Sequence, residues 1–187
     1  AAKTAAKNNF NTLLIDDKNI LGGTTLFQEN ECFKINNSYS NEWLKKEIET
    51  LKSLKNLTIK TRTSLAAYHS YNYLLARENL TDHLDINEKK DKIRQRLWKI
   101  RAKKVIIATG AMERPLIFNN NDRPGIMLSS SIKKYIDFYG VKCGQKISLF
   151  TNNDSAYETA ISLNNSGVNV NSIIDIRDKT NSLIVKQ

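Results

Sequence analysis

The sequence lacks the features of several common protein classes. Its two cysteines, Cys32 and Cys143, lie far apart and form neither a disulfide framework, nor a C-x-x-C redox pair, nor a zinc-binding spacing. No stretch approaches the roughly 18 consecutive apolar residues of a membrane span, and no signal peptide is visible. We therefore expect a cytoplasmic protein with two reduced thiols, no metal site and no membrane partner.

Acidic residues are fewer than basic ones: the chain has 19 aspartates and glutamates and 29 lysines and arginines, which gives a net charge of +10. The basic residues are spread along the chain among asparagines and form no stripe. The longest basic stretch, 89–104, also contains Trp98 and Ile100 and is typical of the solvated faces of a hairpin. Because no recognition helix or RNP-type strand accompanies the charge, we expect no nucleic-acid partner.

A glycine-rich phosphate loop is also missing, although a strand that normally follows one is present. Residues 1–9 predict the end of a helix, and 12–15 predict a strand that ends at Asp16 and Asp17. In a Rossmann unit, the second strand ends in an acid that hydrogen-bonds a ribose hydroxyl, and a G-x-G-x-x-G loop lies upstream. We therefore expect a chain that begins inside the first helix, with an acid pair that favours NAD or FAD over NADP.

The stretch 103–127, KKVIIATGAMERPLIFNNNDRPGIM, is the most informative part of the chain. We expect Val105–Thr109 to form a buried strand that returns to the parallel sheet. Small residues at its end, Thr109 and Gly110, let the backbone pass close to a ligand. The alternative is a buried strand followed by an ordinary glycine turn. Flavoenzymes with two dinucleotide domains close their first domain with such a segment.

The segments between these two features predict a helix and a small β-meander. Apolar residues at three-to-four-residue spacing predict an amphipathic helix at 41–56, followed by a short strand at 57–60. Three antiparallel strands are expected at 66–75, 80–86 and 94–100. His69 and His83 lie in the meander, and we expect both to be structural.

A second βαβ unit follows a helix expected at 128–139. Its expected elements are a strand at 146–150, a helix at 154–166 and a strand at 168–176. The intervening loop, Thr151–Ser155, has no glycine, and Asp154 is expected to cap the helix. Its carboxylate would repel a phosphate, so we expect no second cofactor site here.

These patterns predict an α/β fold of the FAD/NAD(P)-binding Rossmann type, as in two-dinucleotide-domain flavoproteins, with an inserted β-meander and truncation at both ends. Residues 1–115 are expected to form the first dinucleotide-binding domain, without its first strand and Gly-rich loop, and with the meander at about 66–104. Residues 116–145 are expected to be a linker and helix, and 146–187 the start of a second nucleotide-type domain.

Four segments resemble the alpha subunits of heterotetrameric sarcosine oxidases. The family pattern of ATGA-x-ERPL, NNDRPG, Tyr-Gly-Val and TNND-x-AY is matched by Ala108–Leu116, Asn120–Gly125, Tyr139–Val141 and Thr151–Tyr157. The resemblance is specific across 105–178 and weaker, but continuous, back to Asp16. The family's alpha subunit is several times longer than this chain.

The resemblance implies an oxidoreductase that demethylates sarcosine to glycine, forms hydrogen peroxide and can pass the one-carbon unit to tetrahydrofolate. It implies NAD in this subunit, FAD in a beta subunit, FMN between alpha and beta, and gamma and delta subunits that complete the heterotetramer. The chain would then supply cofactor binding and scaffolding. We expect no catalytic residue in it, no activity from it alone, and weak or no NAD binding in isolation.

Site residues are carried over individually. Asp16 matches the ribose-binding acid, Asp17 and Lys18 match adenosine-side residues, Thr24 matches a residue near the dinucleotide, and Leu65 matches a backbone contact to adenine. Simple turn or loop roles are the alternative for Asp17, Lys18 and Thr24. The expected cofactor-binding set is Asp16, Asp17, Lys18, Gly23, Thr24, Leu65, Thr109 and Gly110.

Other interpretations stay open. A related flavin-dependent amine or opine dehydrogenase subunit shares the ATG segment, but the TNNDSAY string favours sarcosine oxidase. A thioredoxin-reductase-like enzyme is disfavoured by the absence of a C-x-x-C pair. The non-enzymatic alternative is a domain that binds a nucleotide or a partner and catalyses no reaction.

Overall fold

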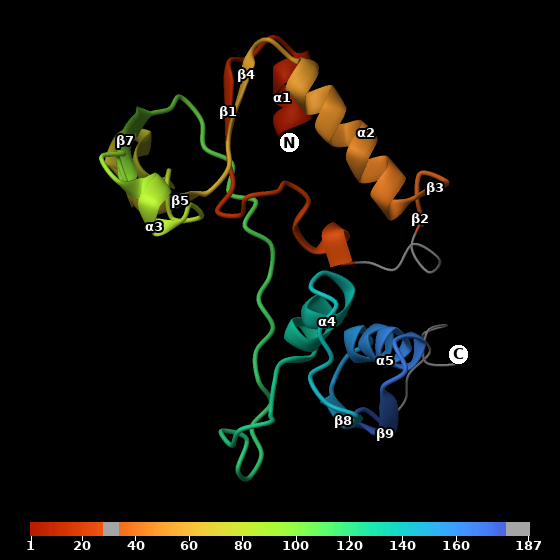
Figure 1. The fold of residues 1–187 in the computed structure, drawn as a ribbon. Helices are drawn as coiled ribbons and strands as arrows, with labels where there is room; N and C mark the ends of the chain where they lie inside the picture. Colours follow the sequence, from red (N-terminus) through yellow and green to blue (C-terminus); the bar gives the residue numbers. More distant parts are fainter. Residues whose placement is uncertain (28–33, 179–187) are drawn as a thin grey trace. The chain divides into compact units, whose positions relative to one another are not determined.

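The computed structural model describes residues 1–27 and 34–178, and its elements are labelled in Figure 1. The chain divides into two compact units. Unit 1 comprises 1–23 and 41–109, and unit 2 comprises 24–40 and 110–187. Cys32 lies outside the described residues.

A parallel βαβ arrangement opens unit 1, as the sequence predicts. Helix α1 (Ala2–Lys7) leads into β1 (Thr12–Ile15), and helix α2 (Ser40–Ser53) connects to β4 (Leu57–Lys60). The two strands pair in parallel from Thr12↔Leu57 to Ile15↔Lys60. An ion pair of 2.6 Å between Lys3 Nζ and Glu47 Oε1 links the two helices, which lie side by side in Figure 1.

The meander is an antiparallel sheet of β5 (Thr63–His69), β6 (Tyr73–Asn79) and β7 (Gln95–Arg101). Three strands are thus present, but two expected bounds are wrong. The expected strand at 66–75 contains the hairpin turn η2 (Ser70–Asn72), where Tyr71 and Asn72 have φ of 60° and 53°. Aromatic residues are typical of strands, so those around this turn made the sequence resemble one continuous strand.

The segment expected as the second meander strand, 80–86, is not a strand. A turn closes through a 3.2 Å hydrogen bond from Leu84 N to Thr81 O, and helix α3 (Ile86–Lys89) follows. The strand β6 ends at Asn79, so its partner begins only at Gln95. Alternating apolar residues therefore gave a false strand signal here.

The expected closing strand at Val105–Thr109 is also wrong. Residues 104–118 form neither helix nor strand, and Ile106 and Ile107 are 68% and 69% exposed. In a doubly wound sheet the closing strand pairs with the first strand of the unit. The strands of unit 1 pair as β1 with β4 and as β5 with β6 and β7, and residues 105–109 pair with none of them.

Unit 2 contains the second βαβ arrangement, close to its predicted bounds. Helix α4 (Ser129–Asp137) precedes β8 (Lys146–Thr151), α5 (Ser155–Asn165) and β9 (Asn169–Asp175), and β8 and β9 pair in parallel. The core of this unit lies between the helices and strands. Its buried residues are Ile132, Ile136, Leu149, Leu163 and Val168.

The 3-10 helix η1 (Gly23–Phe27) begins with the last residue of the first segment of unit 1, and its other residues belong to unit 2. Unit 2 also includes the short antiparallel strands β2 (Lys34–Ile35) and β3 (Ser38–Tyr39). No helix in the described part of the chain is long and apolar enough to cross a membrane.

Candidate functional site

Asp16 follows β1 at the carboxyl end of the parallel pair, the edge where α/β sheets bind nucleotides. Its Oδ1 accepts a 2.9 Å hydrogen bond from the Lys18 backbone N–H, which folds the loop back on itself. Within residues 1–27 and 34–178, Oδ2 accepts no hydrogen bond from the protein. One carboxylate oxygen thus shapes the loop, and the other is open to a ligand hydroxyl.

Backbone hydrogen bonds fix this loop against β4 and β5. The Asp16 N–H donates to Lys60 O, and the Thr63 N–H donates to Asp16 O, both at 2.9 Å. The Arg62 N–H donates to Lys18 O at 2.8 Å. Because Thr63 is buried, the start of β5 is a firm support for the acid. The acidic loop is therefore held at both its first and its last residue.

The structure brings part of the predicted cofactor-binding set together at this edge. Asp17 and Lys18 are exposed and form an ion pair of 2.8 Å with each other. Leu65 lies two residues after Thr63 on β5, and its side chain is 47% exposed. The loop at 16–18 and the first residues of β5 thus share one edge of unit 1.

The remaining predicted residues lie in other segments of the chain. Gly23 and Thr24 begin the 3-10 helix η1, and both are exposed. Thr109 and Gly110 lie in the extended segment after the meander, and the boundary between the two units falls between them. Gly110 has φ of +74°, a conformation that favours glycine, and a Cβ there would meet no atom within 4 Å.

A buried charge cluster, which no local sequence pattern signals, links β4 to the meander. Glu78 is only 8% exposed, and its carboxylate accepts hydrogen bonds from Trp98 Nε1 at 2.7 Å and Lys60 Nζ at 3.1 Å. Burial alone would raise the pKa of Glu78, but these hydrogen bonds and the positive charges outweigh burial, so its pKa is lowered. The Lys60 ammonium also lies 4.5 Å from the centre of the Trp98 ring.

This cluster borders a cavity of about 400 Å³ in unit 1. Apolar groups of Leu13, Ile15 and Ile100 form much of its wall, together with Trp98 and Lys60. Asp16 and Leu65 are not among the lining residues. The lining does include Ile15, Lys60 and Thr63, which adjoin Asp16 in the chain or through backbone hydrogen bonds.

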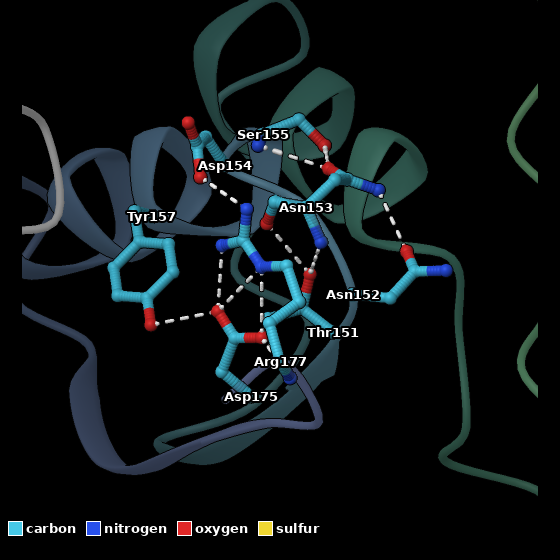
Figure 2. Close-up of polar contacts among 8 residues, drawn as sticks. All are labelled: Thr151, Asn152, Asn153, Asp154, Ser155, Tyr157, Asp175 and Arg177. Atoms are coloured by element: carbon cyan, nitrogen blue, oxygen red, sulfur yellow. Dashed lines mark hydrogen bonds and ion pairs between the residues drawn. The ribbon is translucent and has the colours of Figure 1, made fainter. Parts of the chain in front are cut away.

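The corresponding edge of unit 2 is shown in Figure 2, where the loop after β8 closes on itself. The Asn153 side-chain oxygen accepts a 3.0 Å hydrogen bond from the Ser155 N–H at the start of α5. The Thr151 hydroxyl donates to Asn153 O at 2.8 Å and accepts from Asn153 N at 3.1 Å. Asn153 therefore caps α5, and the expected cap by Asp154 is wrong because Asp154 makes no side-chain capping hydrogen bond.

Asp154 instead pairs with Arg177, whose guanidinium bridges the two sides of this edge (Figure 2). Arg177 Nη1 lies 2.7 Å from Asp154 Oδ1, and Nη2 lies 2.6 Å from Asp175 Oδ2. Hydrogen bonds from Arg177 lower the pKa of Asp175, and those to Asp175 and Asp154 raise the pKa of Arg177. The Tyr157 hydroxyl donates to Asp175 at 3.1 Å.

Two carboxylates and one guanidinium leave this cluster with a net negative charge. A dinucleotide at such an edge needs backbone N–H groups for its pyrophosphate and a carboxylate for its ribose. Here the Ser155 N–H is already capped, and the Asp175 carboxylate at the end of β9 is engaged by Arg177 and Tyr157. The geometry disfavours an anionic ligand in unit 2.

Other candidate chemistry is sparse. His69 is exposed and its ring lies 5.9 Å from that of Tyr73, and His83 Nδ1 lies 3.5 Å from Asp82 Oδ1. The residues that the structure describes contain no group of three or more histidine, cysteine, aspartate or glutamate side chains that could hold a metal ion.

Comparison with known proteins gives a consistent result, although no family model matches. The chain is 38% and 37% identical to sarcosine oxidase alpha subunits from Corynebacterium strains U-96 and P-1, and 33% identical to that from Rhizobium meliloti. Each match covers 95% of this chain and 18% of the relative's length. These matches confirm the resemblance drawn from the sequence.

The fold is similar to that of L-proline dehydrogenase from P. horikoshii, whose crystal structure matches with a TM-score of 0.66 at 23% identity. The match covers 96% of this chain and 34% of that one. The mixed α/β fold expected from the sequence is thereby supported.

Proposed function

We propose that this chain is the dinucleotide-binding part of a sarcosine oxidase alpha subunit, and that it holds NAD at the carboxyl edge of β1 and β4. The parent complex would oxidise sarcosine to glycine with formation of hydrogen peroxide and would use FAD and FMN in addition to NAD. The observation that carries the proposal is Asp16, which ends β1 with one carboxylate oxygen open, in a chain 38% identical to such subunits.

The residues present fit an adenosine ribose. The open Oδ2 of Asp16 would accept a ribose hydroxyl, and the backbone support from Lys60 and Thr63 would keep it in place. Leu65 on the exposed part of β5 would lie on the adenine side. Gly23, Thr24, Thr109 and Gly110 are further residues that we propose for cofactor binding, as are Asp17 and Lys18, which follow Asp16 in the chain.

The chain's own groups would bind and orient the nucleotide and would carry out no chemistry on the amine. NAD would be bound here without being turned over, and the flavins would supply the redox chemistry elsewhere in the complex. Beta, gamma and delta subunits would be its partners, sarcosine and tetrahydrofolate the substrates, and the cytoplasm its location. Unit 2 would serve as scaffold, because its own edge is closed by Arg177.

The test uses the full-length gene product, co-expressed with its neighbouring genes. Bound cofactors are released and identified by mass, and peroxide formation from sarcosine is assayed in the same preparation. NAD with two flavins and sarcosine-dependent peroxide is the expected result. Flavin without NAD, or dye reduction with opines, proline or glycine only, would favour the amine or opine dehydrogenase alternative instead.

A further inference from the structure

Arg62 occupies an unusual position beside the acidic loop. It lies between β4 and β5 with φ of +52°, a left-handed conformation that is unfavourable for a residue with a side chain. Its N–H donates to Lys18 O at 2.8 Å, and its carbonyl accepts the Asn79 N–H at 2.9 Å. The backbone of Arg62 therefore joins the acidic loop to the meander.

The guanidinium of Arg62 is held by a carboxylate of the meander. Arg62 Nε donates to Asp82 Oδ1 at 3.2 Å, and Nη2 donates to the same oxygen. His83 Nδ1 faces this oxygen from 3.5 Å. The hydrogen bond from Arg62 is the largest of the causes that lower the pKa of Asp82. The Arg62 guanidinium, directly before β5, is thus already paired with Asp82.

This pairing bears on which dinucleotide fits. In Rossmann-type sites an acid after the second strand binds the 2′-hydroxyl of NAD, whereas a nearby arginine accommodates the 2′-phosphate of NADP. Arginine is suited to that role, because its planar guanidinium donates several hydrogen bonds to one phosphate. Arg62 is bonded through its backbone to the loop that carries Asp16, so it is the arginine positioned to take that role.

We propose that Asp82 is a specificity-determining residue, which holds the Arg62 guanidinium in an ion pair and thereby keeps it from a 2′-phosphate. The site then favours dinucleotides with a free 2′-hydroxyl, because Asp16 and Asp17 present negative charge and the neighbouring arginine is engaged. This inference rests on the proposed nucleotide site at Asp16.

The test measures nucleotide selection by the full-length gene product after removal of bound nucleotide. Each variant is incubated with equimolar NAD and NADP, and the retained nucleotides are quantified by mass. Asp82→Asn is expected to raise the retained NADP:NAD ratio about tenfold, equivalent to about 1.4 kcal/mol. Adding Arg62→Gln to Asp82→Asn should return the ratio to near its original value, since the freed cation is then gone.

Glu47→Gln is the matched control, because it removes one carboxylate from the Lys3 ion pair in the same unit. An equal rise in this control would mean that the effect is one of net charge, and would overturn the inference. Asp82→Ser provides a second variant with the same expectation, and circular dichroism checks that each variant is folded.

The inference and the proposed function fail in different ways. If the unmodified protein retains NAD and Asp16→Asn abolishes retention, but the ratio is unchanged in both Asp82 variants, the role of Asp82 is refuted and the site stands. If the unmodified protein retains neither nucleotide, both are refuted.

Discussion

Replacement of Glu78 by glutamine tests the buried charge cluster that supports the proposed nucleotide edge. The side chain is 11% exposed and lies within hydrogen-bonding distance of Trp98 Nε1 and Lys60 Nζ. Glutamine has nearly the same shape but no charge, and its amide N–H₂ must face a donor. Hydrogen bonds to charged groups contribute about 1.5–3 kcal/mol each, so we expect the free energy of unfolding to fall by roughly 2–3 kcal/mol.

The assay is urea unfolding of the intact protein followed by tryptophan fluorescence. A Trp43→Phe background leaves Trp98, within the cluster, as this chain's reporter. The matched control is Glu47→Gln at the partly exposed Lys3 pair, for which we expect a loss of about 0–1 kcal/mol. A loss for Glu78→Gln no larger than for the control would refute the structural role of the cluster.

The same cluster predicts the direction of a pH effect. Because the pKa of Glu78 is lowered from 4.5, its ionised form is favoured by folding. Its contribution to stability is therefore fully present above about pH 4.5 and is lost as the pH falls through the folded-state value. The Glu78→Gln variant should lack this acid-dependent component, and an unchanged acid profile would contradict the assignment.

Two further predictions concern unit 2. Asn153→Ala should destabilise the first turn of α5 by about 1 kcal/mol, because the helix loses its cap, and the control Asn152→Ala should change this stability by less than half as much. Hydrogen exchange of the helix amides measures both effects. Equal effects would argue against the cap. Arg177→Met should raise the pKa of Asp175 back toward its ordinary 3.8, so that carboxyl titration by NMR moves to higher pH, whereas an unmoved titration would show that Arg177 does not hold this carboxylate.

The regular elements with strong periodicity could be predicted from the sequence. Both parallel βαβ arrangements and the helix before the second one are present, with ends displaced by a few residues. The three-stranded meander is also present, but only its last strand, β7, lies close to its expected bounds. Strands β1 and β4 match their expected bounds, because short apolar runs between polar turns leave little choice of register.

Elements that depend on partners distant in sequence could not be predicted. Val105–Thr109 has the composition of a buried strand, but a strand needs a neighbour, and this segment pairs with no strand of unit 1. At the site, the identity of Asp16 follows from its place after a strand. The roles of Arg62 and Glu78 depend on side-chain pairs 20 residues apart along the chain, with Asp82 and with Trp98, and no local pattern signals these pairs.

The charge on Asp16 tests the central claim most directly. The measurement is the dissociation constant of NAD for the full-length gene product and its Asp16→Asn variant, by calorimetry after nucleotide removal, with Asp85→Asn as a control in the same unit. Loss of one hydrogen bond to a charged group should weaken binding of the Asp16 variant by about 10- to 100-fold and leave the control unchanged. Equal affinities for all three proteins would contradict a nucleotide site at the end of β1.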